Sequence, residues 1–264
     1  MFSALIVMAK LPLAAFALGT ARGFGLLQIL PLSTRLGLTG MHRAAVAGAL
    51  ALLLLPMLMV QLGPTPSTGA HLALLAAKEG MIGFLLGVIF AVPFWIAETA
   101  GELIDQQRGS QGAVTPDPAG EEQSGIIATL LVLTLTTIFL LSGGMHWLID
   151  ALYRSYALWP AGQLVPHLAP GAAMRVLGLL DSILGAGLLL ASPLLVAMLL
   201  AELSLGLINR FMPQLNVFDL ALSAKGLVLV VGLPLYAVFL IMYLRNGLAP
   251  LPSVQDELRL LSGP

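Results

Sequence analysis

The sequence contains no cysteine and few charged residues. A disulfide framework, a thiolate metal site and a cysteine nucleophile are therefore excluded for these 264 residues. Charged residues make up 9% of the chain, against about 25% in an average soluble domain. The formal net charge of -1 argues against an electrostatic surface for nucleic acid. We therefore expect no nucleic-acid partner.

Signatures of catalytic and cofactor sites are also missing from the sequence. Its 4 histidines are scattered, and no H-E-x-x-H pair is present to hold zinc. Ser142 and His146 lack the G-x-S-x-G elbow, and one helical turn leaves no room for a substrate between them. No glycine-rich phosphate loop follows a strand, because no segment reads convincingly as a strand. We expect a non-enzymatic protein with no cofactor and no bound metal.

Long apolar stretches fill most of the chain, since 58% of its residues are hydrophobic. About 20 apolar residues in a helix span the hydrocarbon core of a bilayer. Short connectors separate most of the stretches, a pattern typical of helical hairpins. The sequence therefore predicts an all-α, membrane-embedded protein with about six long apolar helices. These are expected at Leu11–Leu32, Ala44–Leu62, Leu72–Ala97, Ile126–Leu141, Leu177–Ile208 and Leu220–Leu244.

Charges within these stretches make them poor lipid-facing helices. Arg22 interrupts the first stretch, Glu202 the fifth, and Lys225 follows the start of the sixth. A charge at bilayer depth costs several kcal/mol unless it faces protein or water. Lysines and arginines also fall about equally on the two sets of connectors, so they do not orient the chain. We expect these three charges to have too few internal partners, and the apolar surface to be covered by other proteins.

The connector Glu98–Gly125 is rich in acidic residues and carries 6 of the 13 in the chain. If the third helix continues into it, Glu98, Glu102 and Asp105 lie on one helical face, which we expect to be hydrated. Arg108 is placed three residues after Asp105, within reach of an ion pair. Beyond it, glycines and prolines exclude a regular helix. Two interpretations remain open, a solvent-exposed loop and a small-residue loop packed inside a narrow aqueous passage.

The connector Asn209–Phe218 reads N-R-F-M-P-Q-L-N-V-F and joins two stretches that are each long enough to cross a bilayer. Pro213 removes a backbone donor and is expected to bend the chain. Arg210, Gln214 and Asn216 need polar partners if they lie at membrane depth, whereas the neighbouring apolar side chains favour burial. A hydrated interfacial turn and a polar contact with another subunit are both compatible with this pattern.

Several motifs resemble the T component of the type III secretion export gate. They are D-Q-Q-R-G from Asp105 with the Asp117-Pro118 turn, F-L-L-S-G-G from Phe139, L-Y-R-S-Y from Leu152 and W-P at Trp159. The run from Ala201 to Phe218, with Lys225 beyond it, is similar to the signature shared with the flagellar R export protein. The resemblance covers nearly the whole chain, and its Q-R-G-S, Y-R-S-Y and W-P features favour the injectisome branch.

The resemblance implies a subunit of a conical gate for unfolded polypeptides in the bacterial inner membrane, raised toward the periplasmic side. One copy would join about five R-type and about four S-type subunits, with the U-type switch protein and the V-type export protein as further partners. Residues 1–176 would correspond to an R-type subunit, with the acidic Gly/Pro loop at about 98–125, and residues 177–264 to an S-type hairpin with a polar tail.

Two sets of functional residues are implied by the same resemblance. The residues of the loop that plugs the closed pore would be Asp105, Arg108, Gly109, Ser110, Gln111, Gly112, Ala113, Val114, Asp117 and Pro118. The residues that contact other gate subunits would be Glu202, Arg210, Pro213, Gln214, Asn216, Phe218 and Lys225. The alternatives are a proton- or ion-coupled transporter with Glu98 and Glu202 as relay carboxylates, and a structural scaffold for the assembly.

Overall fold

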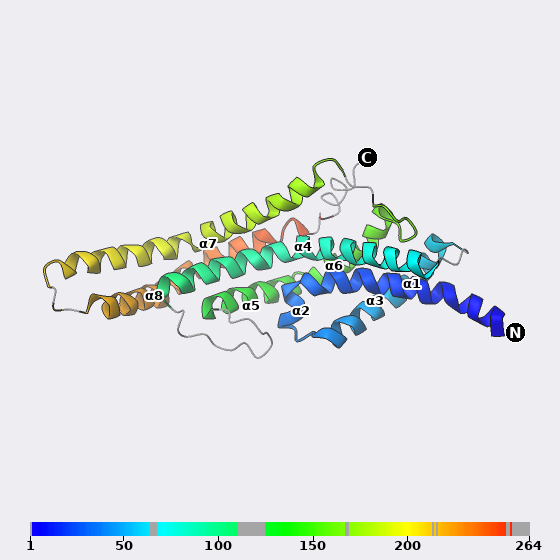
Figure 1. The fold of residues 1–264 in the computed structure, drawn as a ribbon. Helices are drawn as coiled ribbons and strands as arrows, with labels where there is room; N and C mark the ends of the chain where they lie inside the picture. The colour runs from blue at the N-terminus through cyan, green and yellow to red at the C-terminus, as the bar shows by residue number, and fades with distance from the viewer. Residues whose placement is uncertain are drawn as a thin grey trace. The chain divides into compact units, whose positions relative to one another are not determined.

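The computed structural model describes residues 2–63, 68–109, 125–166, 169–212, 214, 216–251 and 254, and these residues form helices with no strand among them (Figure 1). The predicted all-α fold is confirmed for this part of the chain. In chain order the helices are α1 (Phe2–Ile29), α2 (Pro31–Arg35), α3 (Gly40–Leu62), α4 (Gly69–Arg108), α5 (Ile126–Leu141), α6 (Gly144–Leu158), α7 (Ala172–Asn209) and α8 (Val217–Gly247).

Five of the six predicted apolar stretches each lie within one helix, and α5 has the predicted bounds. The first, Leu11–Leu32, runs past the end of α1 and into α2, because the chain leaves the helix at Leu30, the residue before Pro31. The helix α4 continues to Arg108, so the first part of the predicted acidic connector is helical. The sequence did not predict α6 as a separate helix, because polar residues interrupt its apolar character. These residues, His146, Asp150 and Arg154, recur every four positions and lie on one side of the helix. Its opposite side is apolar and buried, as in an amphipathic helix.

Four helices in the described part of the chain are long and apolar enough to cross a membrane: α3, α4, α7 and α8 from Asp219 onward. The helices α5 and α6, separated by Ser142 and Gly143, pass the same test as one broken segment. Gly143 has a φ of 81°, a left-handed conformation that favours glycine and allows the break. The described residues thus contain four or five candidate membrane spans.

The helices belong to two compact units. The first comprises Met1–Ala91, Gly143–Val176 and Pro250–Pro264, and the second comprises Val92–Ser142 and Leu177–Ala249. The contacts therefore group the chain differently from the division at residue 177 that the resemblance implies, and that division stays a prediction.

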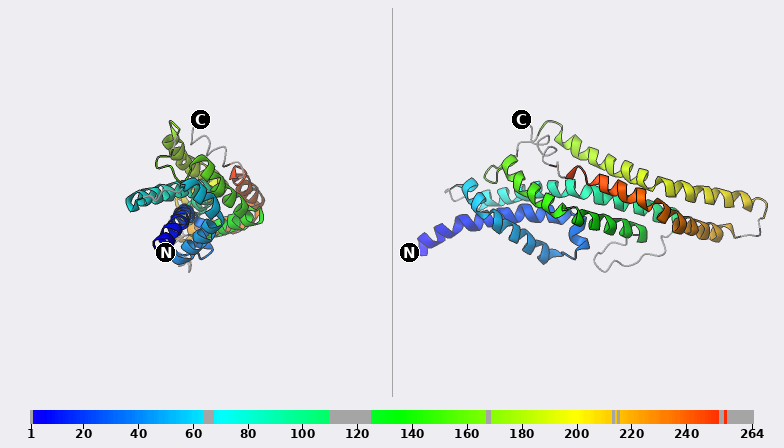
Figure 2. Two further views of the ribbon diagram at one scale, coloured as in Figure 1. Left: turned by 90° about the vertical axis from the view of Figure 1, so that its right-hand side faces the viewer. Right: turned by 180° about the vertical axis from the view of Figure 1, so that it is seen from behind.

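In the first unit, α1 lies beside α3 and the start of α4 (Figure 2). A Cβ atom on Gly19 would lie 2.9 Å from the Cβ of Ala51, and one on Gly83 would lie 2.0 Å from the Arg22 carbonyl oxygen. A side chain at either position would therefore collide with the neighbouring helix. These two glycines therefore allow close packing between helices of the same chain.

In the second unit, α7 and α8 form a hairpin and the end of α4 packs against α5 (Figure 1). The Phe94 ring on α4 meets the Phe139 ring on α5 edge to face, with centroids 5.5 Å apart. Many apolar side chains of the hairpin are exposed, including Leu207, Val230 and Leu235. An exposed apolar surface of this extent is suited to lipid or to another protein.

Candidate functional site

Two acidic side chains of α4 hold the start of α5, and so fix both ends of the intervening loop. The Asp105 Oδ2 atom accepts hydrogen bonds from the backbone amides of Ile127 at 2.8 Å and Ala128 at 3.2 Å. The Glu102 Oε1 atom accepts one from the Gly125 amide at 2.9 Å. The first amides of a helix have no acceptor within that helix, so α4 provides the cap of α5.

Glycine makes room for this contact on both helices. Gly125 occupies the N-cap position of α5, where a Cβ atom would lie 2.1 Å from Asp105 Oδ2. A Cβ atom on Gly101 of α4 would lie 2.2 Å from the Ala128 Cα atom. The absence of a side chain at the N-cap lets a carboxylate from another helix take the place of a local capping residue.

The prediction of a hydrated acidic face is wrong for Asp105, which is only 4% exposed. The expected repulsion between carboxylates is offset because backbone amides at the positive end of α5 bind Glu102 and Asp105. The Arg108 guanidinium adds an ion pair with Asp105 at 3.2 Å, as the sequence predicted. The buried charge of Asp105 is therefore well compensated.

The structure places three of the predicted plug residues at the base of the loop: Asp105, Arg108 and Gly109. Gly109 follows α4 with a φ of 81°, the left-handed conformation that commonly ends a helix. The remaining predicted plug residues lie outside the described residues. They are Ser110, Gln111, Gly112, Ala113, Val114, Asp117 and Pro118.

Lys225 on α8 has a partner within its own unit. Its ammonium lies 3.3 Å from Glu202 Oε2 on α7, and the Gln107 side-chain amide donates to the same oxygen at 3.4 Å. The expectation that Lys225 and Glu202 lack internal partners is therefore wrong. The two charges are 23 residues apart in sequence, and only the hairpin brings them together.

The tip of the hairpin is polar and exposed. Arg210, Gln214 and Asn216 are all exposed, and the Asn216 amide donates to the Asp219 carboxylate. Pro213 lies outside the described residues, as does the side chain of Phe218. Among the described residues, Lys225 therefore pairs with Glu202 instead of joining the polar side chains of the tip.

A buried polar network in the first unit was missed in the sequence. The Arg22 side chain is fully buried and donates to Glu79 Oε2 at 2.6 Å, to Ser155 Oγ at 2.8 Å and to the Trp159 carbonyl at 2.8 Å. Its guanidinium also lies over the Tyr156 ring, 3.6 Å from the centroid. The expectation that Arg22 lacks an internal partner is wrong. Glu79, a carboxylate inside the third apolar stretch, was the sequence signal for this pair.

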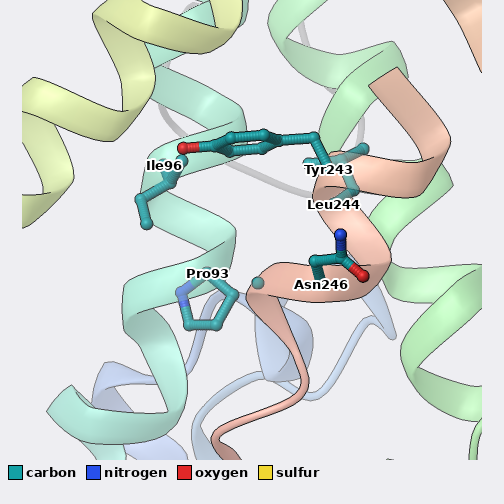
Figure 3. A pocket seen from close by; sticks show the side chains of 6 residues that line it. Pro93, Ile96, Tyr243, Leu244 and Asn246 are labelled. Carbon is teal, nitrogen blue, oxygen red and sulfur yellow. The ribbon is translucent and has the colours of Figure 1, made fainter. Parts of the chain in front are cut away.

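A pocket of about 290 Å³ lies in the second unit between α4 and α8 (Figure 3). The Tyr243 ring extends from α8 toward Ile96 of α4, and Pro93 and Asn246 lie beside it. The described residues that line it include no Asp, Glu, Lys, Arg or His. Within the described ranges, no group of three His, Cys, Asp or Glu residues is placed to bind a metal.

Comparison with known proteins assigns the chain to a family. The family described as bacterial export proteins, family 1, matches residues 13–250. The Yop proteins translocation protein T of Yersinia pestis is 34% identical over 252 residues, which cover 95% of each chain. The surface presentation of antigens protein SpaR of Salmonella typhimurium is 32% identical over 84% of this chain and 82% of its own length. The flagellar biosynthetic protein FliR of Caulobacter vibrioides is 31% identical over 75% of this chain and 77% of its own.

Proposed function

Because this chain belongs to the family 1 bacterial export proteins, we propose that it helps form and seal the inner-membrane entry pore of a type III secretion export gate. Its multi-pass apolar helices and its export family agree with a bacterial inner-membrane protein that is not an enzyme. The proposed substrates are unfolded polypeptides. The proposed position within the gate is raised toward the periplasmic side of the membrane.

The proposed sealing role rests on the hydrogen bonds that hold the start of α5 against the end of α4, on either side of the polar loop. Asp105 and Glu102 hold the amides that follow the loop against the helix that precedes it. A loop with fixed ends can return to one position after a substrate has displaced it. Small residues between Gly109 and Gly125 would then block a narrow pore to water and ions.

Deletion of Gly112–Thr115 tests the plug. Shortening the loop leaves its anchors in place, so the complex should still assemble while ion leakage across the inner membrane increases. Leakage is measured as conductance in energised cells or vesicles that contain the intact complex. Met41→Ala is the control, since Met41 is 85% exposed on α3 in the other unit. Unchanged conductance in the deletion variant would remove the plug role.

The proposed partners are R-type and S-type gate subunits, in about five and about four copies, together with the U-type and V-type export proteins. The exposed tip and apolar face of the hairpin support a docking role. In this proposal Arg210, Pro213, Gln214, Asn216 and Phe218 contact the S-type subunits. Glu202 and Lys225 contribute by fixing the hairpin, since the structure pairs them with each other.

No observation in the described residues favours the transporter alternative. Glu202, one of its two relay carboxylates, instead holds the hairpin together, because it is bound by Lys225 and Gln107. The scaffold alternative is compatible with the docking role, and the conductance experiment separates it from the seal.

A further inference from the structure

The turn that follows α6, Trp159–Gln163, is held by one long polar side chain from each of α1, α3 and α4. Arg22 of α1 donates to the Trp159 carbonyl. Gln61 of α3 accepts from the Ala161 amide at 3.0 Å and donates to the Tyr156 carbonyl at 3.3 Å. Lys78 of α4 donates to the carbonyls of Pro160, Ala161 and Gln163. All of these groups belong to the first unit.

Lys78 is surrounded by oxygen atoms. Its ammonium lies 3.0 Å from the Pro160 carbonyl, 3.3 Å from that of Ala161 and 2.9 Å from that of Gln163. The ammonium also forms an ion pair with Glu79 Oε1 at 2.6 Å. The angles of this contact are not those of a hydrogen bond. An ammonium has three N–H donors, and the turn presents one carbonyl for each of them.

Three carbonyls that point to one place repel each other and need a positive partner when water is absent. Lys78 is 7% exposed, and its bond to the Ala161 carbonyl is buried while those to Pro160 and Gln163 are partly buried, so water has limited access to this centre. Buried carbonyls without a partner cost free energy, and rings of carbonyls replace the hydration shell of monovalent cations in channels. The Glu79 carboxylate adds a negative charge to the same oxygen set. The arrangement has the ligand chemistry of a site for a monovalent cation.

We propose that the carbonyl oxygens of Pro160, Ala161 and Gln163, with the Glu79 carboxylate, form a monovalent-cation site that the Lys78 ammonium fills from within the chain. The covalent tether keeps the site occupied at any ion concentration, and so fixes the turn to α4. Gly162 lets the turn lie close to the backbone of α3, because a Cβ atom at this position would lie 2.8 Å from the Gln61 carbonyl oxygen. This inference does not depend on the proposed export function.

The proposal predicts that a free cation can replace the side chain of Lys78. Lys78→Ala removes the tethered ammonium and leaves the four oxygens, so added ammonium ions should bind and close the turn again. Tetramethylammonium is the size control, because its methyl groups keep the charge too far from the carbonyls and donate no hydrogen bond.

The reporter is a single cysteine, which is possible because the natural chain has none. Ala161 is fully buried, so Ala161→Cys in the full-length chain should react slowly with N-ethylmaleimide in membranes. Adding Lys78→Ala should raise the labelling rate at least tenfold. Ammonium chloride should return the rate toward that of the parent, whereas tetramethylammonium chloride should not. The matched control is Lys10→Ala, since Lys10 is exposed and its loss should not change labelling.

Two outcomes would overturn the proposal: labelling unaffected by Lys78→Ala, or equal rescue by both salts. A second pair of variants covers the case in which Lys78→Ala does not fold. Lys78→Arg keeps a cation with several donors, so the introduced cysteine should stay protected from labelling. Lys78→Met fills similar space without a charge, so labelling of the cysteine should become faster. Equal labelling of these two variants would also contradict the cation site.

Discussion

At the scale of single residues, Tyr156 combines a favourable ring with an unsatisfied hydroxyl. The Arg22 guanidinium lies 3.6 Å from the centre of the ring, while the buried hydroxyl has no hydrogen-bond partner among the described residues. A cation over an aromatic ring is stabilising, and a buried polar atom without a partner is destabilising. The two parts of this side chain therefore act in opposite directions.

Tyr156→Phe should keep or raise the free energy of unfolding, because it removes the unsatisfied hydroxyl and retains the ring. Tyr156→Leu should lower it by at least about 1 kcal/mol, because it removes the ring beneath Arg22. Thermal unfolding of the full-length chain in detergent, with both variants in parallel, measures the difference. A loss in Tyr156→Phe as large as that in Tyr156→Leu would show that the hydroxyl has a partner.

At the scale of helices, the capping of α5 depends on a side chain from α4. Asp105→Ala should lower the free energy of unfolding by about 1–2 kcal/mol, the usual cost of a lost helix cap. Asp105→Asn keeps one acceptor oxygen for the Ile127 amide and should cost less. Hydrogen exchange at the Ile127 and Ala128 amides measures the local effect. Exchange rates unchanged by Asp105→Ala would contradict the cap.

Two glycines in helices provide a matched test of close packing between elements. A Cβ atom on Gly101 would lie 2.2 Å from the backbone of α5, so Gly101→Ala should destabilise the chain by about 1–3 kcal/mol. Outside its own helix turn, no described atom lies within 4 Å of the Cβ position on Gly178 of α7. Gly178→Ala should therefore stabilise the helix, by up to about 1 kcal/mol. Both values come from thermal unfolding, and effects of the same sign would contradict the packing of α4 on α5.

At the scale of the whole molecule, charge and apolar surface lead to different expectations about partners. The charges expected to require other subunits are paired within the chain, as Arg22 with Glu79 and Lys225 with Glu202. The apolar side chains of α7 and α8 remain exposed. A need for partner subunits therefore rests on the apolar surface and the polar tip of the hairpin.

If the hairpin tip binds S-type subunits as proposed, the double variant Gln214→Ala and Asn216→Ala should reduce their recovery and leave the proposed R-type subunits bound. Amides in a dry interface need partners, and each one lost costs about 1–3 kcal/mol. Native mass spectrometry of the copurified complex gives the stoichiometry. Gly178→Ala serves as control, since it changes the hairpin away from its tip. Full occupancy of S-type subunits in the double variant would place their contact elsewhere.

The helical fold, the membrane class and the family followed from the sequence alone. Apolar stretches such as Ile126–Leu141 define helices by length and composition, because a bilayer-length segment must satisfy its backbone hydrogen bonds internally. The run from Ala201 to Phe218 indicated the export family, and the match over residues 13–250 confirms it. The Asp105–Arg108 pair was predictable because three residues separate its members on one helix.

The partners of the remaining buried charges were decided by the tertiary structure. Arg22 and Glu79 are 57 residues apart, and Arg22 and Trp159 are 137 apart, so no local periodicity relates them. Asp105 was expected to face water because its helical neighbours are acidic, but the packing of α5 on α4 brings amide donors to it. Composition and periodicity identify which side chains need a partner. The partner itself is set by contacts between helices distant in sequence, because charge compensation depends on distance in space.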